Sequence, residues 1–146
     1  MSALHAAIGQ SLGASRWIAV DQTRIDTFAD VTEDRQFIHI DPDAAARGPY
    51  GTTVAHGFLS LSLLSTLAYD VMPALGGYKS SINYGFDRVR FLAAVPSGAR
   101  LRAQFTLADV TEKAPDRVLV KLTVELEIEG ADKPALCADW LVLLHL

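Results

Sequence analysis

Polar and apolar residues alternate along much of the second half of the chain. Over residues 100–107 and 118–128 every second side chain is apolar, which predicts two strands with one face toward solvent. Residues 135–144 are richer in apolar side chains, which predicts a strand buried on both faces or at an interface. A fourth strand is expected over residues 82–91, with Gly85 as a bend or bulge.

The N-terminal segment has helical spacing instead. Leu4, Ile8 and Leu12 recur every four residues, which predicts a first short helix with Gly13 just past its end. Residues 17–20 then predict a short strand.

Two capping signals mark the next helices. Asp21 precedes an apolar stripe over residues 22–32 and is expected to be the N-cap of a helix there. Asp41 and Pro42 form a helix start, with aspartate as the cap and proline at the first helical position. This second helix is expected to be short and to end before Gly48.

The segment 54–72 differs from the other helical segments because apolar residues cover most of its circumference. Small polar residues interrupt it at Ser60, Ser62, Ser65 and Thr66. A helix that is apolar all round must be buried on all sides, so we expect a sheet to wrap it. Helices followed by long strands joined by hairpins predict an α+β fold. We expect one domain over residues 1–146, with a curved antiparallel sheet around a long central helix.

Composition narrows the functional classes. The chain has 146 residues, half of them hydrophobic, which suits one domain with a sizeable core. The formal net charge is −4 without a basic block, so we expect no nucleic-acid partner. No apolar run reaches the roughly 18 residues of a membrane span, and the N-terminus lacks secretory-signal features. Cys137 is the single cysteine, which excludes an internal disulfide and fits a cytoplasmic location; the four histidines lack metal-ligand spacing, so no metal is expected.

Asp34 and His39 form one candidate acid–base pair. Their D-x4-H spacing can bring a carboxylate and an imidazole to one water molecule in the loop before the long helix. Adding water to an activated double bond needs a base for the water and an acid for the carbon that becomes protonated. The spacing alone favours the plainer interpretation, in which the aspartate caps a turn and the histidine is structural.

His56 and Gly57 stand at the head of the predicted long helix. The first N–H groups of a helix have no partner within it, and the helix dipole adds positive potential there. A carbonyl oxygen that gains negative charge could be held at this point. A glycine chosen for tight packing, and a histidine bonded to nearby backbone, explain the same residues.

Arg88 and Arg90 would point to one face of a strand and could meet a phosphate. Such a pair more often lies on a solvated face or forms an interface salt bridge. The choice between these interpretations stays open at the level of sequence.

Three blocks in this order, residues 25–39, 51–60 and 84–98, together resemble the MaoC-like dehydratase family of hotdog-fold proteins. That family includes the (R)-specific enoyl-CoA hydratases and the nodulation protein N-like proteins. The resemblance runs from about Trp17 to Arg102.

The hydratase pattern is similar to a helix that ends in G-D, followed by x-N-P-x-H. Its aspartate falls on Asp34 and its histidine on His39. Glu33, Gln36 and Phe37 stand where the pattern has glycine, asparagine and proline. Gln36 can still donate and accept hydrogen bonds, and this variant is similar to the nodulation protein N-like branch.

The resemblance implies that Asp34 and His39 hold a water against C3 of a trans-2-enoyl thioester and exchange protons with the water and C2. It implies that the N–H of Gly57 polarises the thioester carbonyl, with His56 and Gln36 beside the substrate, and that the product is an (R)-3-hydroxyacyl-CoA. It further implies a homodimer that binds acyl-CoA near the subunit interface and needs no cofactor besides this substrate. Arg88 and Arg90 are our own candidates for the CoA phosphates.

Two other functions are compatible with these residues. A hotdog acyl-CoA thioesterase shares the helix N-terminus but does not need the Asp34–His39 pair at this position. A non-catalytic acyl-CoA-binding protein of the nodulation protein N type could keep the fold, and Glu33, Gln36 and Phe37 are the residues that favour it.

Overall fold

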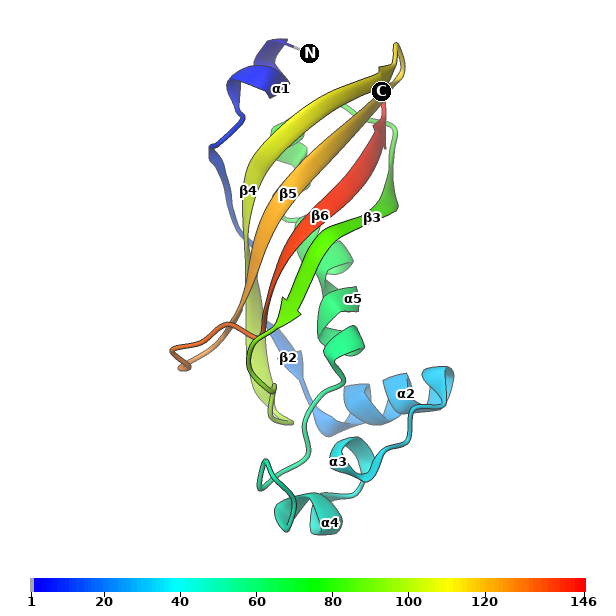
Figure 1. The fold of residues 1–146 in the computed structure, drawn as a ribbon, viewed down its shortest axis with the longest axis vertical. Coiled ribbons are helices and arrows are strands. Elements are labelled where there is room, and N and C mark those ends of the chain that lie inside the picture. The colour runs from blue at the N-terminus through cyan, green and yellow to red at the C-terminus, as the bar shows by residue number, and fades with distance from the viewer. Residues whose placement is uncertain (1) are drawn as a thin grey trace.

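A curved antiparallel sheet is the main body of the computed structural model, which describes residues 2–146 (Figure 1). Within that range the sheet has six strands in the order β1-β4-β5-β6-β3, and β2 also pairs with β4. Every strand pairing is antiparallel, as predicted. The strands are β1 (Ser11–Ala14), β2 (Ile18–Val20), β3 (Ser80–Phe91), β4 (Ala99–Ala114), β5 (Arg117–Ile128) and β6 (Leu136–His145).

The helices precede the long strands in the chain, which confirms the α+β prediction. They are α1 (Ser2–Ala6), α2 (Gln22–Thr32), α3 (Phe37–Ile40), α4 (Pro42–Ala46) and α5 (Gly57–Ala68), followed by the 3-10 turn η1 (Met72–Leu75). Both predicted caps are confirmed. The Asp21 side chain accepts from the N–H of Arg24, and the Asp41 side chain accepts from the N–H of Ala44.

Helix α5 lies along the inner face of the sheet, and its N-terminal end meets α2 and α3 at one end of the molecule (Figure 1). Leu64 and Leu67 of α5 are almost completely buried. They belong to one hydrophobic cluster with inward-facing side chains of the central strands, among them Phe105 and Leu122. At roughly 1.5–3 kcal/mol for each fully buried large apolar side chain, this contact is a major source of stability.

The prediction that the long helix is buried on all sides is wrong. The helix is shorter than the apolar segment, and Phe58 on its outer side is 68% exposed. The described sheet covers one side of α5, so side chains on the opposite side remain uncovered. Val54, which was expected in the helix, instead forms an isolated bridge with Pro96.

The first helix also ends earlier than predicted. It stops at Ala6, and Leu12 belongs to strand β1. Gly9 has a left-handed φ of 83° and donates its N–H to the carbonyl of Leu107. This turn directs the chain along the edge of β4, so a strand partner overrides the spacing of four residues.

The edge strand β3 and the central strand β6 follow their predicted positions. The pairing of β3 with β6 shifts register between Asn83 and Gly85, which confirms the predicted bulge. Strand β6 alternates buried and half-buried residues, so its outward face is only partly covered. Burial raises the pKa of the half-buried Cys137 thiol on that face, which keeps the thiol protonated at neutral pH.

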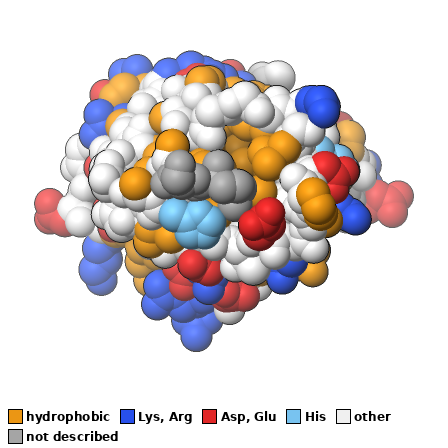
Figure 2. Space-filling model, turned by 90° about the horizontal axis from the view of Figure 1, so that it is seen from above, with side chains coloured by type: hydrophobic (Ala, Val, Ile, Leu, Met, Phe, Trp, Pro, Cys, Tyr) orange, Lys and Arg blue, Asp and Glu red, His pale blue; other side chains and the backbone are white. Residues whose placement is uncertain are grey.

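Basic side chains are dispersed over the surface at one end of the molecule. Seen from the end that carries both termini, Lys and Arg side chains are scattered around the rim, and hydrophobic side chains are exposed nearer the middle (Figure 2). Ion pairs such as Arg102–Glu127 at 2.7 Å neutralise part of the basic charge. In the stretch from residue 2 to the C-terminus there is no helix long and apolar enough to cross a membrane.

We predict that Leu67→Ala lowers the free energy of unfolding by about 2–5 kcal/mol, because it leaves a cavity at a fully buried site. Urea denaturation followed by circular dichroism measures this change. Val31→Ala, on the 74% exposed side of α2, should change it by no more than about 0.5 kcal/mol. Equal effects of the two substitutions would contradict the packing described.

Candidate active site

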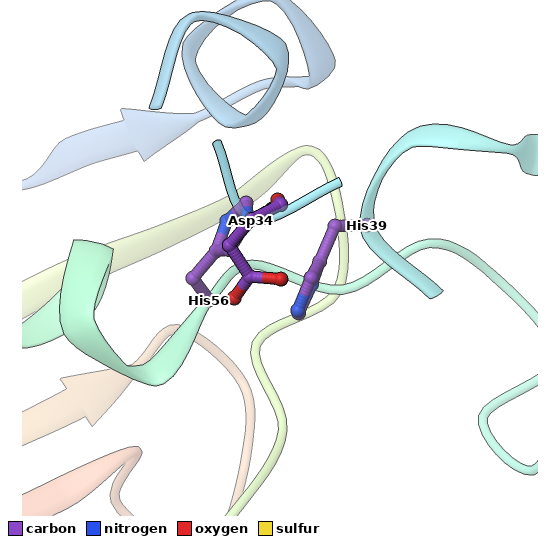
Figure 3. Close-up of side chains that lie close together, drawn as sticks. All are labelled: Asp34, His39 and His56. Atoms are coloured by element: carbon purple, nitrogen blue, oxygen red, sulfur yellow. The ribbon is translucent and has the colours of Figure 1, made fainter. Parts of the chain in front are cut away.

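Three residues from separate parts of the chain converge where α2, α3 and α5 meet. They are Asp34, His39 and His56, and one ring nitrogen of each histidine and one carboxylate oxygen of the aspartate lie within 4.8 Å of one another. Glu33 ends α2 in the left-handed conformation, with φ of 62°, and so turns the chain toward α3. The Asp34 carboxylate is directed toward the two imidazole rings (Figure 3).

His39 is held by the backbone of the segment that leads into α5. Its Nδ1 lies 2.6 Å from the carbonyl oxygen of Val54, and the N–H of Val54 donates to the carbonyl of Ile38 at 2.9 Å. A carbonyl can only accept, so Nδ1 carries the proton and the lone pair of Nε2 is free. His39 lies on the short helix α3 and is 7% exposed. The prediction that it stands in a loop is therefore wrong.

His56 is tied to the other member of the candidate pair. Its Nε2 donates to the backbone carbonyl of Asp34 at 2.9 Å, and its ring stacks on that of His39 with centroids 3.8 Å apart. This confirms the interpretation of His56 as a histidine bonded to backbone. Its Nδ1 is buried and has no hydrogen-bond partner among the described side chains and backbone. Sequence spacing did not predict the stacking, because it depends on how α3 packs against α5.

Gly57 lies at the first position of α5, on the wall of a pocket of ≈ 490 Å³ that His39 also lines. A Cβ atom at this position would lie 3.0 Å from the ring of Phe91. The glycine therefore lets the Phe91 ring pack closely against the start of α5, in agreement with one of the two interpretations. Its place in the pocket wall is also what the other interpretation requires, in which the first turn of the helix holds a carbonyl oxygen that gains negative charge.

Gln22 is a residue of the site that the sequence did not reveal. Its Nε2 donates to the carbonyl of His39 at 2.7 Å and to the Asp26 carboxylate at 2.8 Å, while its Oε1 accepts from the Thr53 hydroxyl at 2.6 Å. These bonds connect α2, α3 and the segment before α5. A glutamine directly after an N-cap gives no sequence signal for such a role.

The other predicted site residues lie further from this centre. Gln36 is the N-cap residue of α3, where its exposed side chain makes no capping hydrogen bond. Arg88 and Arg90 are opposite Asp139 and Cys137 in the pairing of β3 with β6, so they share the outward face of the sheet. Arg88 forms an ion pair with Asp139 at 3.3 Å, and neither arginine lines the pocket.

The arrangement suits proton transfer better than metal binding. Asp34, His39 and His56 are metal-ligating residue types, but the two rings are only 23° from parallel. Stacked rings direct their in-plane lone pairs side by side, whereas a metal needs them to converge. The imidazole of His39 lines the pocket, and the Asp34 carboxylate lies close to it, so the two can instead act together on one water molecule.

Comparison with known proteins identifies the class of protein. The family described as "MaoC like domain" matches residues 3–129. The chain is 46% identical over 139 residues to "Nodulation protein N" of Rhizobium leguminosarum bv. viciae, covering 94% of this chain and 86% of the relative. It is 44% identical over 139 residues to "3-hydroxyacyl-thioester dehydratase Z" of Mycobacterium tuberculosis, covering 95% of this chain and 91% of the relative. The solved (R)-hydratase from A. caviae involved in PHA biosynthesis superposes with a TM-score of 0.76 and 26% identity, covering 92% of this chain and 94% of the other.

The chain therefore belongs to the MaoC-like dehydratase family, and its fold is the hotdog fold that the resemblance implied. Its relatives include a protein named as a 3-hydroxyacyl-thioester dehydratase and one named as an (R)-hydratase, as well as nodulation proteins N.

We predict that Gln22→Ala lowers the free energy of unfolding by about 1–3 kcal/mol, because it removes part-buried hydrogen bonds around His39. The imidazole NMR signals of His39 should shift as its backbone loses this support. Gln10→Ala makes the same change at an exposed position and should alter neither quantity. Unchanged His39 signals in Gln22→Ala would contradict a positioning role.

Proposed function

We propose that the protein catalyses the reversible addition of water to a trans-2-enoyl thioester and forms an (R)-3-hydroxyacyl thioester. One observation carries this proposal. The carboxylate of Asp34 and the imidazole of His39 converge beside the first turn of α5. The family membership and the names of the relatives support the same class of reaction.

The proposed reaction divides between two side chains. With the Nδ1 proton of His39 engaged by Val54, Nε2 is free to exchange a proton. Asp34 and His39 hold the water against C3, and one of them accepts its proton as the C–O bond forms. That proton passes to the other group, which delivers it to C2, so the double bond is saturated and both groups end the cycle in their starting protonation states. The reverse order of steps removes water from a 3-hydroxyacyl thioester.

The N-terminus of α5 supplies the electrophilic part of the proposed site. The first backbone hydrogen bond of α5 runs from the N–H of Ser60 to the carbonyl of His56. The N–H of Gly57 therefore has no acceptor within the helix. Donation from Gly57 to the thioester oxygen stabilises the negative charge that develops there. The ring of Phe91 packs against this glycine and keeps that part of the pocket apolar. His56 holds Asp34 in place through the backbone bond. A contact between Gln36, exposed at the start of α3, and the substrate stays a prediction.

The substrate is proposed to be an acyl-CoA thioester, with no further cofactor. Placing the CoA phosphates at Arg88 and Arg90 stays a prediction, because both residues lie on the outward face of the sheet. A route from the pocket to that face would pass around the edge strand β3, to which both arginines belong.

A homodimer is part of the proposal, and β3 is the surface that favours it. As the outer strand of the described sheet, β3 has one unpaired edge that can accept another strand. Apolar side chains are exposed on or beside it at Ile82, Tyr84, Phe86 and Phe91, with Phe58 of α5 adjoining Phe91. A two-fold axis at this edge would bury the same surface on both subunits.

We predict that the protein hydrates crotonyl-CoA, and that Asp34→Asn and His39→Ala each lower kcat about 100- to 10,000-fold, as expected for loss of an acid–base group. Loss of enoyl absorbance without release of free thiol measures hydration. Asp30→Asn, on an exposed carboxylate of α2, and His5→Ala are the matched controls and should keep the parent rate.

Three results would contradict this assignment. Thiol release would indicate a thioesterase. Unchanged absorbance with several chain lengths would indicate a binding protein without turnover. Parent-level hydration by Asp34→Asn or His39→Ala would place the chemistry elsewhere.

We predict that the protein is a dimer in solution and that Ile82→Lys makes it monomeric, because a charge would be buried where β3 meets its partner. Size-exclusion chromatography with light scattering measures the mass. Val31→Lys introduces the same charge on exposed α2 and should leave the dimer intact. A monomeric parent at micromolar concentration would refute the proposed interface.

A further inference from the structure

A groove continues beyond the candidate active site along α5. Two hollows of ≈ 250 and ≈ 150 Å³ lie along it. Ser65 of α5, Asn83 of β3 and Trp140 of β6 line both of them. Since an α-helix rises 1.5 Å per residue, Ser65 is roughly 12 Å along the helix from Gly57. The groove therefore lies where the remote end of a medium-length acyl chain would reach if its thioester were held at Gly57.

Two aromatic rings separate the groove from the catalytic pocket. Phe91 lines that pocket and Phe58 lines the first hollow, and the rings meet edge to face with centroids 6.1 Å apart. Phe58 is 68% exposed and Phe91 is 50% exposed. Both rings therefore lie at the surface between the pocket and the groove, on the edge proposed above for the dimer.

The far part of the groove is more polar than a hydrocarbon chain requires. The Asn83 amide donates to the Ser65 hydroxyl at 3.4 Å, a long hydrogen bond that is easily exchanged for another. Tyr69 and Ser81 also line the second hollow. A purely hydrocarbon ligand would leave these groups without the water that otherwise satisfies them.

Trp140 is a second feature of the groove that indicates a polar ligand, independently of the hydroxyl and amide groups that line it. Its side chain is buried, at 4% exposure, and its Nε1 has no hydrogen-bond partner within residues 2–146. An indole N–H can only donate, and buried donors are nearly always paired. The ring of Phe86 is nearly parallel to that of Trp140, with centroids 6.1 Å apart, and Phe86 is 37% exposed on the edge strand. Trp140 lines both hollows, so a ligand in the groove lies against this indole.

We propose that this groove selects acyl thioesters whose chain carries a hydrogen-bond-accepting oxygen near its remote end. The oxygen of a hydroxyl or keto group there accepts from the indole N–H of Trp140 and from the Asn83 amide. The intervening carbons lie against Leu61 and Leu64, which line the first hollow. The inference rests on the proposed hydration site, because that site fixes where the thioester end is held.

The test compares the binding of decanoyl-CoA and ω-hydroxydecanoyl-CoA by isothermal titration calorimetry. Both are saturated, so neither can be hydrated. The parent should bind the hydroxylated chain about tenfold more tightly, as expected for one added hydrogen bond to a buried donor. Trp140→Phe removes the N–H and keeps an aromatic ring beside Phe86, so its two Kd values should coincide. Trp17→Phe makes the same change below Arg102, where the guanidinium lies 4.6 Å from the ring, and should keep the preference.

Equal Kd values in the parent, or a preference that survives in Trp140→Phe, would overturn the proposal. If Trp140→Phe does not fold, Asn83→Ala serves in its place, since this exposed strand position tolerates truncation. It should weaken the preference several-fold, and an unchanged preference would count against the groove. The readout is separate from turnover. A failure to hydrate crotonyl-CoA would remove the proposed reaction, whereas loss of the binding preference would remove only the groove's specificity.

Discussion

The packing of α5 against the inner face of the sheet determines where the rest of the molecule lies. Leu64 and Leu67 are sealed against the central strands, and the cost of exposing such side chains fixes both the depth and the direction of the helix. The position of its first turn follows, and with it the places of His56 and Gly57. The same contact sets the width of the groove between α5 and β3, so the candidate active site and its extension depend on one interface.

Backbone carbonyls orient the two imidazole rings of the candidate active site. His39 donates to Val54, and His56 donates to the carbonyl of Asp34. Both rings are thereby directed by main chain, which is less free to move than a side chain. Gln22 extends this support by bonding to the carbonyl of His39. The candidate acid–base group is consequently a product of how three short segments meet.

The sequence predicted correctly those elements that depend on residues close together in the chain. Alternation identified the long strands, and the caps at Asp21 and Asp41 located two helix starts, because each depends on neighbouring residues. The errors fall where distant contacts decide. Leu12 joins a strand because β4 offers it a partner, and Phe58 stays exposed because the described sheet covers only one side of α5. For the same reason the sequence predicted that Asp34 and His39 could meet, but gave no signal for the stacking of His56 or the bonds of Gln22.

The contact between Gly57 and Phe91 has a consequence for how this family can diverge. A Cβ at residue 57 would lie 3.0 Å from the ring of Phe91, so the ring would have to shift by a few tenths of an ångström to admit a side chain there. A larger residue at 57 is accommodated more easily when residue 91 is small, and a bulky residue at 91 favours glycine at 57. Natural variants should therefore change these two positions together. Such covariation would link the first turn of the central helix to the end of the edge strand, across the mouth of the pocket.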